Sequence, residues 1–298
     1  MKKNEIKKIL VPVDFSKTSE TAISNAMTLA KLLKAEVFLI CVIENDWFHL
    51  STILEMEIIQ PLRLDIEKAI EKKLNEIQKK NSKIFDIVPE IYIATGNIHT
   101  EIIKFSEEKK INLIVMGTRG VSGYDEMFIG SNAQRVVALS ETPVLTMQNN
   151  CNKSEFKNIL IPIDNSTHSR EKVNLAIIIA KLFCANIHII GLYDSKDKQE
   201  LNKFQTKLES VEKIFKSNKL PYKTSMVHGE NLAKLAINYA TENKCDLIII
   251  NIGHESNIAD NFLGAFAQQI VNHSKIPVLS IKHTRGHYSN SAAGFPGF

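Results

Sequence analysis

An internal duplication constrains this chain more than any other feature of its sequence. Residues 7–40 align without a gap with residues 157–190, at an offset of 150 positions. The ends of the two copies also repeat, in two further pairs of segments: 111–117 with 245–251, and 142–148 with 276–282. Each copy is about 140 residues long, an ordinary size for a domain. The sequence therefore predicts two domains of one fold in tandem.

The duplication also sets the expected domain boundaries. We expect a first domain at residues 1–147, a polar linker at 148–156, a second domain at 157–282 and a tail at 283–298. The tail is rich in glycine and serine, so we expect it to be disordered. Its His283 and His287 are the nearest approach to a metal-ligand spacing, and the nine histidines form no cluster. We predict no metal site.

The alternation of strand-like and helix-like segments indicates the fold class. Five apolar segments of the first copy predict strands: Ile9–Val13, Val37–Val42, Glu90–Ala94, Ile111–Met116 and Pro143–Met147. Helical patterns lie between them, with Ser16 and Asn97 as expected N-caps and a last helix at 131–140. Continuous apolar runs are typical of parallel strands buried on both faces. The pattern predicts an α/β fold in each half, a five-stranded parallel sheet with helices on both faces.

The first copy has a longer connection, at residues 45–89, than the second. It predicts one helix with Ile70, Leu74 and Ile77 on its apolar side, separated by Pro61 from an earlier apolar turn. Trp47 and Phe48 follow the second strand closely. The segment is either a lid or partner surface, or a helix that packs over its own domain.

Composition excludes several functional classes. No apolar run approaches the ~20 residues of a membrane span, and the N-terminus lacks the apolar stretch of a signal peptide, so we expect a cytoplasmic protein. The net charge of +4 comes without a dense basic stripe, which argues against nucleic-acid binding. No G-x4-G-K-[ST] motif is present, so the chain is not a P-loop enzyme.

A glycine-rich loop follows the fourth predicted strand. Residues 117–131 hold four of the twelve glycines. Gly117 and Gly120 are expected to allow positive φ angles and close approach of a ligand to the backbone. Gly130 and Ser131 then open a helix, whose free N–H groups favour an anion. The spacing predicts either a phosphate site or a loop that binds nothing.

The motif G-x2-G-x9-G-[ST] is complete in this loop, and the first strand ends in VPVDFS. Together these segments resemble the universal stress protein family, and the resemblance extends over both halves. It implies a Rossmann-like domain of the adenine nucleotide α-hydrolase-like type. It also implies binding of ATP, ADP or AMP, with or without Mg²⁺, in the manner of the family's ATP-binding members.

The resemblance assigns site residues by position in the motif. Adenine and ribose contacts fall on Pro12, Asp14 and Val42, and Met116 and Gly117 lie beside the ribose and α-phosphate. The positions that would line the phosphates are Gly120, Gly130, Ser131 and Asn132. Arg119 is either a further phosphate contact or a solvated surface residue.

The second half departs from this motif. Asn251, His254 and Ala265 replace Gly117, Gly120 and Ser131, and only Gly264 keeps its glycine. Asp164 still matches Asp14. We therefore expect the N-terminal half to hold the nucleotide, and the C-terminal half to bind it weakly or not at all.

Three functions of different classes follow. The favoured one is a nucleotide-binding regulatory protein of the stress response that acts on an unknown protein partner. The others are a slow ATP hydrolase that uses Asp14, and a ligand-free interaction module; no catalytic residue is assigned, since only Asp14 offers a base. The resemblance also implies pairing of final strands, as in the family's common dimers, so the final strands of the two halves are expected to pair within one chain as a pseudo-dimer. A further homodimer is left open.

Overall fold

The computed structural model of the chain describes residues 6–44, 56–118, 129–148, 155–165, 172–252 and 263–282. The strands of the N-terminal half are β1 (Lys8–Pro12), β2 (Glu36–Ile43), β3 (Glu90–Thr95), β4 (Leu113–Gly117) and β5 (Val144–Met147). Its helices are α1 (Lys17–Leu33), α3 (Met56–Phe85), α4 (Ile98–Glu108) and α5 (Ser131–Leu139). Each predicted strand is therefore present, with ends shifted by one or two residues.

The C-terminal half repeats this order of elements. Its strands are β6 (Asn158–Ile163), β7 (Asn186–Tyr193), β8 (Tyr222–His228), β9 (Leu247–Ile252) and β10 (Val278–Lys282). Its helices are α6 (Val173–Phe183), α7 (Lys198–Ser217), α8 (Leu232–Glu242) and α9 (Ala265–His273). The predicted α/β fold of each half is confirmed.

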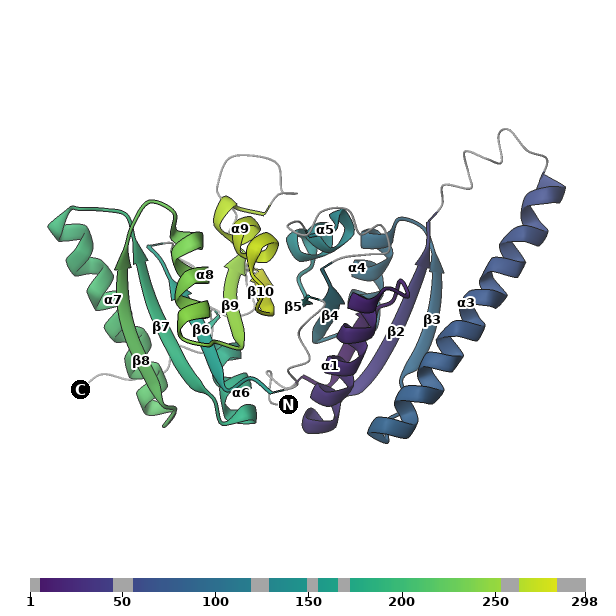
Figure 1. Cartoon of the computed structure of the whole chain (residues 1–298), viewed down its shortest axis with the longest axis horizontal. Helices are drawn as coiled ribbons and strands as arrows, with labels where there is room; N and C mark the ends of the chain where they lie inside the picture. Colours follow the sequence, from purple (N-terminus) through teal and green to yellow (C-terminus); the bar gives the residue numbers. More distant parts are fainter. Residues whose placement is uncertain are drawn as a thin grey trace.

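The two halves share one ten-stranded sheet, in the order β3-β2-β1-β4-β5-β10-β9-β6-β7-β8. Strands pair in parallel within each half, and β5 meets β10 in an antiparallel pair that places Leu145 opposite Leu279. Figure 1 shows the result, with α3 and α7 at the two outer edges and β5 and β10 between the halves. The final strands thus pair within one chain, as the sequence predicts.

Polar contacts reinforce the junction between the halves in a symmetric way. The Gln148 side-chain amide donates to the Ser274 carbonyl at the end of α9. In the other direction, the Lys282 ammonium lies 3.3 Å from the Leu139 carbonyl at the end of α5 and 3.1 Å from the Glu141 carboxylate. Each half therefore caps the last helix of the other.

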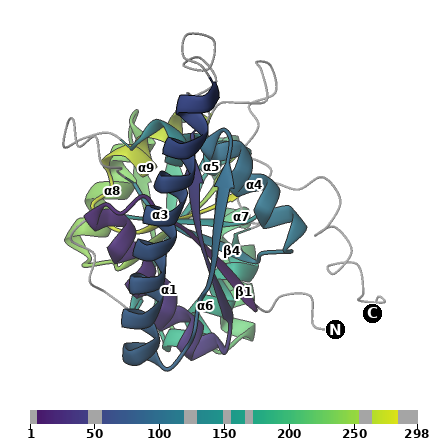
Figure 2. The same cartoon turned by 90° about the vertical axis from the view of Figure 1, so that its right-hand side faces the viewer.

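The core lies in two layers, one on each face of the sheet. Helices α1, α3, α6 and α7 cover one layer, and α4, α5, α8 and α9 cover the other. Figure 2 looks at the sheet from its α3 end, with α1 and α4 on opposite sides of the strands. Both layers contain residues of both halves, so the hydrophobic core is continuous across the junction. No helix in the described ranges has the length and apolar character needed to cross a membrane.

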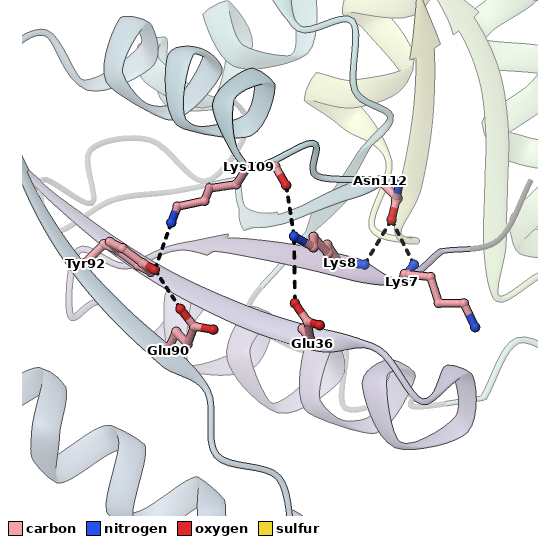
Figure 3. A network of polar contacts seen from close by, with 7 residues as sticks. All are labelled: Lys7, Lys8, Glu36, Glu90, Tyr92, Lys109 and Asn112. Atoms are coloured by element: carbon pink, nitrogen blue, oxygen red, sulfur yellow. Dashed lines mark hydrogen bonds and ion pairs between the residues drawn. The ribbon is translucent and has the colours of Figure 1, made fainter. Parts of the chain in front are cut away.

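The amino-terminal edge of the sheet is held by one side chain in each half. The Asn112 Oδ1 atom accepts hydrogen bonds from the Lys7 and Lys8 main-chain N–H groups, at 2.8 and 3.0 Å (Figure 3). Asp246 does the same for the N–H groups of residues 157 and 158, both at 3.0 Å. These contacts align β1 with β4 and β6 with β9, at the edge opposite the strands' carboxyl ends.

The predicted N-caps are confirmed. The Ser16 hydroxyl accepts from the Ser19 N–H at 3.2 Å and begins α1, and the Asn97 side chain accepts from the Thr100 N–H at 3.4 Å and begins α4. Both bonds satisfy an N–H group that the first turn leaves without a helical partner. Each cap fixes the point at which the chain turns from a strand end into a helix.

The prediction that Pro61 breaks the helix of the long connection was wrong. Helix α3 runs without interruption from Met56 to Phe85, with Pro61 inside it. Proline removes one helical hydrogen bond. Pro61 lies near the start of the helix, so only a short part of α3 precedes the missing hydrogen bond. The longer part after Pro61 is held in place by Leu74, which is fully buried in the core. Trp47 and Phe48 lie outside the described residues.

Candidate functional site

A cavity of about 520 Å³ opens at the carboxyl ends of the N-terminal strands. It lies where the strand order changes direction between β1 and β4, since the chain passes from β1 outward to β2 and β3 and then returns to β4. Parallel α/β sheets bind their ligands at such a point. Its size is within the ~300–1,000 Å³ range of small-molecule sites.

Eight of the ten predicted site residues line this cavity: Pro12, Asp14, Val42, Met116, Gly117, Gly130, Ser131 and Asn132. They come from the ends of β1, β2 and β4 and from the start of α5. The other two, Arg119 and Gly120, lie outside the described residues. The structure thus brings distant parts of the sequence together, and the role of each residue in binding stays a prediction.

Asp14 has a defined local role at the end of β1. Its Oδ1 atom accepts hydrogen bonds from the Ser16 N–H at 3.0 Å and from the Ser16 hydroxyl at 2.6 Å. The same hydroxyl caps α1. Asp14 therefore helps to fix the turn from β1 into α1, and its carboxylate is exposed at the cavity.

Gly117 serves a different purpose from the one predicted. Among the described glycines, only Gly96 has a positive φ, so the expectation of positive φ at Gly117 was wrong. A Cβ atom at position 117 would lie 2.7 Å from the Thr18 Cβ and 2.9 Å from the Thr18 main-chain carbonyl carbon. Gly117 is needed because the first turn of α1 packs directly against the end of β4.

We expect Gly117→Ala to lower the free energy of unfolding by about 1–3 kcal/mol, the usual cost of overpacking. The added methyl group meets the Cβ and the main-chain carbonyl carbon of Thr18, which cannot move without shifting α1. Urea denaturation followed by circular dichroism measures the change. Gly229→Ala is the matched control, because its nearest neighbour is the end of the flexible Leu235 side chain, at 2.9 Å. Equal losses in the two variants would contradict this explanation.

The start of α5 supplies main-chain donors to the cavity. Gly130 is the N-cap, with φ −59° and ψ 146°, and no side chain caps this helix. Its own N–H donates to the Thr118 carbonyl at 2.7 Å, which joins the two ends of the glycine loop. The following N–H groups have no helical acceptor, and the helix dipole makes this end favourable for an anion.

Helix α3 forms a wall of the cavity. The sequence predicts for this segment either a lid or partner surface, or a helix that packs over its own domain. The helix packs over its own domain, and residues of it that were not assigned to the site line the cavity. The additional lining residues on this side are Phe15, Cys41, Ile66, Ala69, Ile70 and Lys73. Burial raises the pKa of the Cys41 thiol to about 11, with a smaller contribution from the Asp14 charge, so this group is a neutral part of the wall at pH 7. The apolar spacing of Ile70, Leu74 and Ile77 predicted which face of the helix packs on the core. It did not predict that the neighbouring face lines a cavity.

In the C-terminal half, helix α7 packs closely against the strand that corresponds to β2. Gly191 stands where Cys41 lies in the first half, and a Cβ atom there would lie 2.6 Å from the Leu208 side chain and 3.2 Å from the Phe204 ring. Phe204 is 1% exposed. Helix α7 therefore presses its side chains directly onto β7, whereas residues of α3 line an open cavity.

The helix start itself is the same in both halves. Gly264 is the N-cap of α9 with φ −56° and ψ 151°, close to the values at Gly130. Ala265 follows it where Ser131 follows Gly130, so the C-terminal helix start lacks the hydroxyl. The halves therefore differ in side chains and in the packing of α7 more than in the backbone of this turn.

The described residues contain no group of three or more histidine, cysteine, aspartate or glutamate side chains arranged to hold a metal ion. His283 and His287 lie outside them. Within the described cavity lining, Asp14 is the one carboxylate and Lys73 the one cation. The described residues therefore form a binding site with apolar walls, a few polar groups and a helix start.

Comparison with known proteins identifies the family. The model of the universal stress protein family matches this chain twice, at residues 5–148 and 155–282. Universal stress protein MJ0531 of Methanocaldococcus jannaschii is 33% identical over 146 residues, which cover 49% of this chain and 84% of that protein. Universal stress protein YxiE of Bacillus subtilis is 31% identical over 151 residues, 47% of this chain and 98% of its own.

A solved structure extends the similarity of fold to both halves. A universal stress protein from Archaeoglobus fulgidus superimposes with a TM-score of 0.74 at 22% identity, covering 93% of this chain and 97% of that one. The family model covers both halves, and the solved structure has the same overall fold across both of them. The chain therefore belongs to the universal stress protein family, as a tandem member with two family domains.

Proposed function

We propose that this protein is a regulatory protein that binds an adenine nucleotide in its N-terminal half. The observation that carries the proposal is the cavity of about 520 Å³, in which apolar walls and the start of α5 face the same space. Apolar surface suits a nucleobase, and main-chain N–H groups at a helix start suit phosphates. The motif resemblance assigns the same residues to the same ligand.

Within this proposal the ligand has a definite orientation. The base lies between the ends of β1 and β2, against Pro12 and Val42. The ribose lies near Asp14, and the phosphates extend toward Ser131 and Asn132 at the start of α5. All five groups that define this path line one cavity.

The proposal assigns Asp14 to positioning and not to catalysis. Its Oδ1 atom already accepts two hydrogen bonds from Ser16. Phosphoryl transfer depends mainly on charge stabilisation around the phosphates. The described lining offers one cation, Lys73, and no second carboxylate that could act as a base.

The C-terminal half is proposed to be a structural partner without a nucleotide of its own. Phe204 and Leu208 occupy the space beside β7, and Ala265 replaces Ser131. Its last strand completes the sheet against the nucleotide-binding half. In this proposal, a change in the N-terminal cavity reaches the second half through the shared sheet and alters a surface for a protein partner.

Thermal denaturation with added nucleotide tests the function. ATP at about 100 times its Kd should stabilise the protein by about 2.7 kcal/mol, because ligand binds the folded state only. Protein stripped of co-purified ligand is compared with ATP, adenosine and UTP. Stabilisation by ATP and not by UTP supports an adenine site. No stabilisation by any of the three would favour a ligand-free interaction module.

A further inference from the structure

The described cavity lining has little positive charge to set against the negative charge of its expected ligand. Phosphates carry negative charge, and the described lining contributes one carboxylate, Asp14, and one ammonium, Lys73. The start of α5 supplies N–H donors and a partial positive charge only. Lys73 is therefore the one full positive charge that the described lining can offer to an anionic ligand, and the family motif does not include it.

Lys73 contacts Phe15, in the turn that follows β1. Its ammonium lies 5.2 Å from the centre of the Phe15 ring, an arrangement that attracts a cation. Phe15 itself has a φ of 63°, a left-handed conformation that bulky residues rarely adopt. Lys73 forms no ion pair or hydrogen bond with the described part of the chain, and its side chain is exposed.

The C-terminal half shows the same lysine in another state. A shared spacing aligns α3 with α7, in two sets of residues: Ile70, Lys73, Leu74 and Ile77, and Phe204, Lys207, Leu208 and Val211. The Lys207 ammonium donates to the main-chain carbonyl of Asp164 at 2.5 Å. Asp164 is the counterpart of Asp14, so both lysines reach toward the end of the first strand of their half.

The two lysines differ in their contacts, and the difference suggests a structural role for Lys207 and a binding role for Lys73. Lys207 is bonded to the protein in a half whose helix packs Phe204 and Leu208 directly onto β7. Lys73 stands beside an open cavity with an aromatic ring as its described neighbour. An ammonium that lies over an aromatic ring keeps its hydrogen-bond donors available for an acceptor.

We propose that Lys73 is a specificity-determining residue that binds the phosphate chain of the nucleotide from the α3 side of the cavity. This inference rests on the proposed function and adds to it a second phosphate-binding wall, opposite the start of α5. The nucleotide is thereby held between a charged side chain and main-chain donors. The site distinguishes phosphorylated nucleotides from nucleosides through this charge.

Calorimetric titration of the full chain with ATP and with adenosine tests the proposal. Lys73→Met keeps the length of the side chain and removes its charge. We expect it to weaken ATP binding about 10-fold, as for the loss of a charge-assisted hydrogen bond, and to change adenosine binding less than about twofold. Lys73→Arg should retain ATP binding. The matched control is Lys72→Met, at an exposed position of the same helix outside the cavity lining.

Salt dependence gives a second readout. ATP binding by the parent protein should weaken more between 50 and 300 mM NaCl than binding by Lys73→Met, because a charge pair is screened. If the parent binds ATP while Lys73→Met binds ATP with the parent's affinity and salt dependence, the role of Lys73 is refuted and the proposed function stands. Equal losses for ATP and adenosine refute it too. If the parent binds neither ligand, both proposals fail.

Discussion

Replacing Gly130 with valine is expected to weaken ATP binding about 100-fold or more while the protein stays folded. Gly130 lines the cavity as the N-cap of α5, and its φ of −59° and ψ of 146° are open to any residue. The substitution should therefore cost little stability. Its branched side chain would stand over the N–H groups that the phosphates need. Calorimetric titration with ATP measures the loss, and thermal denaturation without ligand checks the fold.

The duplication supplies a matched control for this variant. Gly264 has nearly the same backbone conformation at the start of α9, with φ −56° and ψ 151°. Gly264→Val introduces the same side chain at the equivalent point of the C-terminal half and should leave ATP binding unchanged. If both variants lose ATP binding equally, both halves contribute to binding. If neither does, the start of α5 is not the phosphate site.

A charge placed in the β5–β10 pair is expected to destabilise the whole chain by about 4 kcal/mol or more. Leu279 is 1% exposed and lies opposite Leu145, which is 3% exposed, in the core layer shared by both halves. Leu279→Asp removes a buried leucine, which alone costs about 3–5 kcal/mol, and leaves a carboxylate without a partner. Domains are typically stable by only about 5–15 kcal/mol.

Urea denaturation followed by circular dichroism measures this loss. Leu32→Asp makes the same chemical change at a position of α1 that is 48% exposed, and should alter stability by no more than about 0.5 kcal/mol. A similarly small effect of Leu279→Asp would mean that the two halves do not form a continuous sheet in solution. Sedimentation of the parent protein would show whether two chains associate further.

Much of the fold could be predicted because its strands and helix starts depend on local sequence patterns. Five apolar runs per half gave the strands, since strands buried on both faces contain few polar residues. The oxygens of Ser16 and Asn97 gave the helix starts. The pairing of the two final strands was expected from the family resemblance and from the repeat of 142–148 at 276–282, and β5 and β10 do pair, in antiparallel fashion.

The parts that could not be predicted depend on packing between distant segments. The need for glycine at position 117 comes from Thr18, which is 99 positions away in sequence and touches β4 only after α1 has folded onto the sheet. Lys73 lines the cavity because of the rotation of α3 about its axis, which periodicity defines only coarsely. Pro61 was tolerated because the helix after it is anchored by core contacts.

The C-terminal half illustrates the same limit. Its motif loss at Asn251 and Ala265 predicted weak binding, through missing donors. The structure adds a feature that no motif contains: Gly191 lets the Phe204 and Leu208 side chains approach β7 closely. Two independent features, one of the loop and one of the helix, thus favour a single nucleotide site in the chain.

The number of ATP molecules bound per chain tests this central claim most directly. Equilibrium dialysis of ligand-free protein against radiolabelled ATP, at concentrations well above Kd, gives that number without any assumption about location. The cavity beside α5 predicts one ATP per chain, and hydrogen exchange should slow in β1, β2 and α5 when it binds. Two ATP per chain, or one ATP that protects β6, β7 and α9 instead, would contradict it.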